Sequence, residues 1–126
     1  MADPTVALHA ALIAALDGAC SCDVWDAVPQ NTPYPYVVTD YQYSDNEDFV
    51  AQRFDRRICY LSVWSDISQS EVMGIIAEIE TLHEQPLTLT TGTCVSLRVD
   101  SKRTFREPDA LTFRGQVILR IYTSHS

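Results

Sequence analysis

The stretch that decides the fold is Arg57-Ile58-Cys59-Tyr60-Leu61-Ser62-Val63-Trp64-Ser65, followed closely by a patterned segment that ends near Leu82. β-branched and aromatic residues fill the stretch, so we expect a strand. Because side chains alternate along a strand, this one is apolar on both faces. A strand of this kind is covered on both faces, by its own domain or by a partner. Cys59, Leu61 and Val63 form one face, and Ile58, Tyr60 and Trp64 form the other.

The segment after the strand is predicted to be a helix that opens at Ser68. Glu71 follows Ser68 at the spacing of a capping box, in which two side chains satisfy backbone N–H groups of the first turn. Ile67 and Val72 flank this cap at the spacing of a hydrophobic staple. Apolar residues then recur as on a helix face that packs against a core. These core positions are Val72, Ile75, Ile76, Ile79 and Leu82.

The opposite side of this helix carries Ser70, Gly74, Ala77 and Thr81, here called the small-residue stripe. A glycine inside a helix costs ~1 kcal/mol relative to alanine. Small side chains, however, allow another backbone to come close. The stripe is therefore either an ordinary exposed surface or a close-packed contact. We predict that the subunit interface contains the stripe together with Tyr60 and Trp64.

The N-terminal segment is predicted to be a helix that Asp3 caps and Pro4 starts. We expect it to stop at Asp17-Gly18. It is apolar nearly all round, which indicates burial on more than one side. In a chain this small, we expect its second face to meet another subunit. One stripe holds Thr5, Leu8, Leu12, Ala15 and Leu16, and the opposite one holds Val6, Ala10 and Ile13.

The chain between the first helix and Arg57 is predicted to contain one further strand. Residues 20–33 are expected to form a loop with a short extended piece at residues 24–28, because turn-forming residues dominate the end of this segment. Residues 34–43 are predicted to be a strand with Pro35 near its beginning. Residues 44–55 are polar and acidic and are expected to form a loop. Val37, Thr39, Tyr41 and Tyr43 would share one face of the strand.

A hairpin with a long tip is predicted at the C-terminus. Its first strand, residues 94–99, would point Val95, Leu97 and Val99 inward. Residues 100–109 are expected to form a long polar loop. The last strand alternates from Leu111 to Tyr122, with Gly115 as a candidate bulge.

These elements predict an α+β fold: an antiparallel or mixed β-sheet of about four to five strands with two main helices packed on one face. The 126 residues are expected to form a single domain, 1–126. No stretch is long and apolar enough to span a bilayer, and no signal peptide is visible. The default expectation is a cytoplasmic protein without a membrane partner.

The net charge of −8 comes from the N-terminal part of the chain, where no Lys or Arg precedes Arg53. An acidic surface repels nucleic acid, which argues against a DNA-binding protein. It permits a protein past which DNA slides without binding. Arg53, Arg56 and Arg57 are expected to form salt bridges with the acidic part. Lys102, Arg103 and Arg106 form a candidate partner-contact loop, with a solvated loop as the alternative.

No catalytic, cofactor-binding or metal-binding constellation is present, so the chain is not predicted to be an enzyme. The histidines have no Cys, Ser or carboxylate at motif spacing. Asp45, Glu47 and Asp48 lack the glycine and terminal glutamate of a calcium loop. Cys59 and Cys94 are expected to be buried as small apolar residues, and Cys20 and Cys22 to be exposed loop thiols.

Several segments occur in a characteristic order along nearly the whole chain. They are an apolar first helix, Val24-Trp25-Asp26-Ala27-Val28-Pro29-Gln30, Tyr34-Pro35-Tyr36-Val37-Val38, Leu61-Ser62-Val63-Trp64-Ser65, an amphipathic helix and a hairpin. This order resembles the tail-terminator (tail-completion) proteins of long-tailed bacteriophages, prophages and gene transfer agents. The chain differs from that pattern at Thr39-Asp40 and at Ser68-Gln69-Ser70, where glycine is expected.

The resemblance implies a structural virion protein without cofactors. Family members form a ring, commonly a hexamer, that caps the tail tube, stops its polymerisation and provides the surface that joins the head. The implied partners are further copies of the chain, the tail-tube protein and a head-completion or connector protein, while DNA passes through without sequence-specific binding. The implied location is the head-proximal end of the virion tail, and the host cytoplasm during assembly.

The residues themselves leave a second hypothesis open. An acidic inhibitor or immunity-type module would mimic nucleic acid toward a basic partner, using the Asp/Glu-rich N-terminal part. It would be a monomer or dimer, whereas a tail terminator would be a ring.

Overall fold

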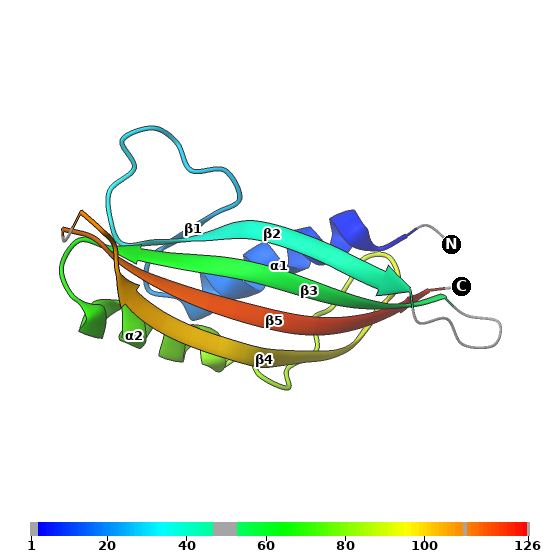
Figure 1. The fold of residues 1–126 in the computed structure, drawn as a ribbon. Coiled ribbons are helices and arrows are strands. Elements are labelled where there is room, and N and C mark those ends of the chain that lie inside the picture. The colour runs from blue at the N-terminus through cyan, green and yellow to red at the C-terminus, as the bar shows by residue number, and fades with distance from the viewer. Residues whose placement is uncertain (1–2, 47–52, 110, 126) are drawn as a thin grey trace.

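The computed structural model describes residues 3–46, 53–109 and 111–125. A long sheet lies in front of two helices, and the strands run along the length of the molecule (Figure 1). The elements are α1 (Thr5–Ala19), β1 (Asp23–Trp25), β2 (Tyr36–Asn46), β3 (Arg53–Ser65), α2 (Gln69–Glu80), β4 (Thr93–Arg106) and β5 (Phe113–His125).

The five strands form one sheet in the order β1-β2-β3-β5-β4. The short β1 runs parallel to β2, and all other neighbours are antiparallel. Both helices cover the same face (Figure 1). The predicted class, a mixed sheet with two helices on one face, is therefore confirmed.

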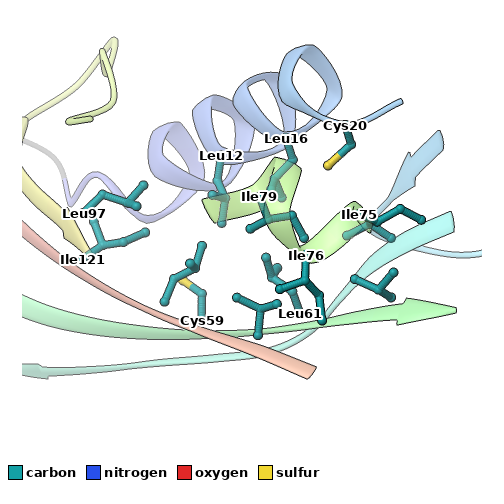
Figure 2. Packing of buried hydrophobic residues seen from close by; sticks show 14 of the residues in the cluster. Leu12, Leu16, Cys20, Cys59, Leu61, Ile75, Ile76, Ile79, Leu97 and Ile121 are labelled. Atoms are coloured by element: carbon teal, nitrogen blue, oxygen red, sulfur yellow. The ribbon is translucent and has the colours of Figure 1, made fainter. Parts of the chain in front are cut away.

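The core lies between the helices and the sheet (Figure 2). The predicted inner face of β3 is buried, and so are the four predicted core residues of α2 from Val72 to Ile79. Each such side chain contributes roughly 1.5–3 kcal/mol when it is fully buried. The helix α1 contributes one buried stripe, Leu8, Leu12 and Leu16.

Gly115 is the point where α2 comes closest to the sheet. A Cβ atom there would lie 2.6 Å from Cγ1 of Val72 and 2.7 Å from Cδ1 of Ile76. Gly115 pairs in regular register with Val63 on one side and Thr104 on the other. The predicted bulge is therefore wrong, and the glycine is needed for close packing.

The ends of the helices differ from prediction in detail. The helix α1 passes through Gly18 and ends at Ala19, where the backbone N–H of Cys20 donates to Leu16 O at 2.8 Å. At α2, Ser68 Oγ accepts from the N–H of Glu71 at 3.1 Å, as predicted. Ile67 is 67% exposed, so the predicted staple is not formed.

Bulges in two strands overturn the predicted alternation. In β2 the register shifts between Thr39 and Tyr41, so that Tyr41 pairs with Tyr60 on the face opposite the helices. In β4 it shifts between Cys94 and Ser96, which leaves Val95 exposed although it was predicted to point inward. One extra residue reverses the face of every side chain that follows it.

The described residues of two predicted loops are largely strand. Residues 100–106 continue β4, and residues 44–46 and 53–55 extend β2 and β3. The other predicted loop residues, 47–52, lie outside the described part. Polar side chains are compatible with a strand here, because one face of the sheet carries no helix.

Candidate assembly surfaces

The face of the sheet opposite the helices, here called the open face, is rich in aromatic side chains. Tyr60 and Trp64 of β3 lie on it, as predicted, and are half-buried. Tyr41 is 60% exposed and contacts Tyr60 edge to face, with ring centroids 5.7 Å apart. The Arg114 guanidinium stacks 5.2 Å from the ring centre of Trp64. Only neighbouring side chains, and no described helix, cover this face.

Arginines on the open face are paired within the sheet. Arg56 donates to Asp45 at 2.5 Å, and Arg114 donates to Asp40 at 3.3 Å. These pairs neutralise much of the local charge, so that aromatic area rather than net charge distinguishes the face. Exposed ion pairs of this kind contribute little to stability.

The small-residue stripe lies on the exposed side of α2. Ser70, Gly74, Ala77 and Thr81 are all exposed. A Cβ atom added at Gly74 would meet no described atom within 4 Å. The glycine is therefore not required by the packing of the subunit itself.

The six predicted interface residues thus fall on two separate surfaces. The stripe belongs to the helical layer, whereas Tyr60 and Trp64 belong to the open face on the other side of the sheet (Figure 1). No single flat contact between two copies uses all six in the same place.

The predicted partner-contact loop is part of β4. Lys102 Nζ lies 2.8 Å from Glu80 Oε2 of α2, and Arg106 stacks 5.4 Å from the ring centre of Phe113. Arg103 is exposed. The three cations therefore lie along an edge strand rather than on a loop.

Arg57 is the largest fully buried side chain among the described residues, and it joins the N-terminal segment to the sheet. It donates to Thr123 Oγ1 at 2.9 Å, to Thr5 Oγ1 at 2.8 Å and to Asp3 Oδ1 at 3.1 Å. Asp55 Oδ2 lies 3.4 Å away. The hydrogen bonds from Thr5, followed by the Arg57 guanidinium, lower the pKa of Asp3 to about 2. The predicted bridges from Arg56 and Arg57 to the acidic part are confirmed.

The cysteines have no chemistry that the described residues reveal. Cys59 and Cys94 are buried, as predicted, but Cys20 is also buried against the core, which corrects its prediction as an exposed thiol. Burial raises the pKa of Cys20 to about 12 and that of Cys22 to about 11, so both remain protonated thiols at neutral pH.

Two negative findings apply to the described residues. They contain no group of three or more His, Cys, Asp or Glu side chains placed to hold a metal ion. None of the helices they form has the length and apolar character needed to cross a membrane.

A family model described as "Tail completion protein gp17" matches residues 6–124, nearly the whole chain. The chain belongs to this tail completion family. It is therefore a structural protein of the virion tail, and the predicted family is confirmed. The family is one of phage structural proteins, which are not known as enzymes. No curated protein matches the sequence.

The tail completion fold is also found in a solved structure titled "Virion of native gene transfer agent (GTA) particle". The match has a TM-score of 0.84 at 20% sequence identity, and it covers 98% of this chain and 99% of that chain. At this identity the likeness shows a shared fold. It extends over both helices and the whole sheet.

Sequence reasoning missed one feature of this tail completion protein: the open edges of its sheet. The short β1 and the long edge strand β4 became visible only with the strand order. The cationic run at residues 102–106 was the available signal, but its polarity indicated a loop.

Proposed function

We propose that this tail completion protein forms a ring of six copies, the number common in its family, and that the ring caps the tail tube and stops its polymerisation. The observation that carries the proposal is family membership over residues 6–124. The same ring would provide the surface to which the head is joined.

Two separate surfaces support an assembly of this kind. A closed ring uses head-to-tail contacts, in which each copy offers two different patches. It must also contact the tube on one side and the connector on the other. We assign the small-residue stripe to contact between copies, and Tyr60 and Trp64 to a second assembly surface on the open face.

The charge of the chain suits a channel for DNA. A net charge of −8 disfavours binding to the phosphate backbone, so DNA would pass without being held. Some acidic residues near the N-terminus also stabilise the subunit, because they form ion pairs within it, as Asp3 does with Arg57.

The test is the assembly of tail tubes from purified tube protein with and without this chain. We expect a discrete oligomer by light scattering, ring-shaped in electron micrographs, and tubes that stop growing once the ring is bound at one end. A chain that stays monomeric in the presence of tube protein, with tubes growing to the same lengths as without it, would contradict the proposal.

A further inference from the structure

The edge strand β4 is only partly covered. The turn after α2 bonds its middle: the N–H of Glu84 donates to Leu97 O at 2.8 Å, and the N–H of Val99 donates to His83 Nδ1 at 2.9 Å. Beyond Val99, no described residue outside β5 bonds the backbone of residues 101–106. These six residues, about 20 Å of strand, are here called the β4 open edge.

The strand β2 is also incompletely covered on its outer side. The three residues of β1 pair only with Tyr36, Val37 and Val38. Among the described residues, none outside β3 bonds the backbone of residues 39–45, here called the β2 open edge. Unpaired N–H and C=O groups along a strand are a template for pairing with another strand.

The two open edges have matching directions for a head-to-tail contact. Each step from β2 to β3, from β3 to β5 and from β5 to β4 is antiparallel, so β2 and β4 run in opposite directions. A rotation about an axis roughly along the strands preserves these directions. The β2 open edge of the next copy would therefore run antiparallel to the β4 open edge, as in the rest of the sheet.

The charges on the two edges favour this pairing over the alternatives. The β4 open edge carries Lys102, Arg103 and Arg106 and no acid, whereas the β2 open edge carries Asp40 and Asp45 and no base. Like charges oppose the pairing of β4 with β4 and of β2 with β2. Asp40, Asp45 and Lys102 already form ion pairs within their own subunit. The preference therefore comes mainly from Arg103 and Arg106, whose positive charge favours the acidic β2 edge and so the head-to-tail combination.

The helices leave apolar groups beside both edges. A hollow beside the β4 open edge is lined by Met73 and Ala77 of α2 together with Lys102. A hollow beside the β2 open edge is lined by Val6 of α1, which is 80% exposed, together with Ser44. A neighbour docked on these edges would cover part of the small-residue stripe and the second face of α1.

We propose that the β4 open edge of one copy pairs with the β2 open edge of the next, so that the sheet continues from subunit to subunit. This inference rests on the proposed ring. Within the subunit, the pairing of β4 with β5 and of β5 with β3 places residues 101–106 level with residues 60–65 of β3. Residues 39–45 are level with residues 56–61 of the same strand. Neighbouring copies are therefore staggered along the strands, as closure of a sheet into a barrel requires.

The test uses two charge-reversed variants and their mixture. Arg103→Glu/Arg106→Glu gives the β4 open edge a net negative charge, and Gln42→Lys/Asp45→Lys gives the β2 open edge a net positive charge. Each variant alone brings like charges together at every junction, so we expect at least a tenfold weaker self-association than in the wild type. In an equimolar mixture every junction between unlike copies is complementary, and we expect assembly to return as an oligomer in which the variants alternate.

Light scattering gives the oligomer size, and circular dichroism verifies that both variants are folded. Arg103→Lys/Arg106→Lys is the matched control, since it retains the charge and should assemble as the wild type does. Wild-type assembly by either reversed variant alone, or a mixture of two folded variants that remains monomeric, would overturn the inference.

Hydrogen exchange provides a readout that is independent of charge. Backbone amides in residues 101–106 and 39–45 should become at least tenfold more protected on assembly. Unchanged exchange in both segments of an assembled ring would also overturn the edge pairing. The proposed function fails separately, when rings assemble through these edges but leave tube length unchanged.

Discussion

Gly115 shows how one absent methyl group sets the distance between a helix and a sheet. Its missing Cβ makes room for Val72 and Ile76 of α2. Gly74, a residue of α2 itself, has no such role within the subunit, because a Cβ atom there would meet no described atom within 4 Å. The two glycines therefore make a matched pair.

We expect Gly115→Ala to lower the free energy of unfolding by about 1–3 kcal/mol, because the added methyl group overpacks the core. Gly74→Ala should raise it by up to ~1 kcal/mol, because alanine is the better residue inside an exposed helix. Urea unfolding of both variants measures the two effects. Equal effects of the same sign would contradict this account of Gly115.

Asp3 predicts a specific dependence of stability on pH. Its pKa is about 2 in the folded protein and 3.8 as the model value for an unperturbed group. Because the pKa of Asp3 is lower in the folded than in the unfolded protein, ionised Asp3 stabilises the fold at pH values above its unfolded pKa. This contribution to the free energy of unfolding is lost as the pH falls from about 4 through about 2. Asp3→Asn should therefore reduce the loss of stability over this window, measured as the change in unfolding midpoint between pH 5 and pH 2. An identical pH profile for wild type and Asp3→Asn would count against the Thr5 and Arg57 contacts.

At the scale of the elements, the sequence pattern predicted which face is buried for some helices and strands but not for others. The alternation of β3 and the core face of α2 were predictable, because a continuous apolar pattern fixes which side is buried. The faces of Tyr41 and Val95 were not, because a bulge changes the register without changing the composition. Residues 100–106 were predicted to be a loop, because sequence polarity does not distinguish a solvated edge strand from a turn.

The stripe on α2 is a prediction of the sequence that still awaits an assembly measurement. We expect Gly74→Leu to weaken oligomerisation at least tenfold and to leave the subunit folded, because the new side chain projects from an exposed surface. Gly18→Leu is the matched control, since a Cβ at Gly18 also meets no described atom within 4 Å. Analytical ultracentrifugation compares the two variants. Normal assembly of Gly74→Leu would show that the stripe is an ordinary surface.

At the scale of the whole molecule, the sequence predicted the layers but not the order of the strands. The strand β3 lies between β2 and β5. The cover predicted for its second apolar face is not supplied by any described helix, so a partner on that face stays a prediction. Nothing in the sequence indicated that β1 would pair in parallel with only the first residues of β2. The separation of the interface residues onto two layers followed from that three-dimensional arrangement and was not predictable from spacing alone.

The length of the strands has a consequence for the reach of each copy. The strand β3 has 13 residues, and at about 3.3 Å per residue it spans about 43 Å. Ile67 and Leu111, which are 67% and 74% exposed, follow β3 and precede β5 at one end of this span. If the strands follow the axis of the ring, the assembly is a deep cylinder rather than a flat disc. Its two rims would then be too far apart for tube and connector to compete for the same residues, so each could be attached without displacing the other.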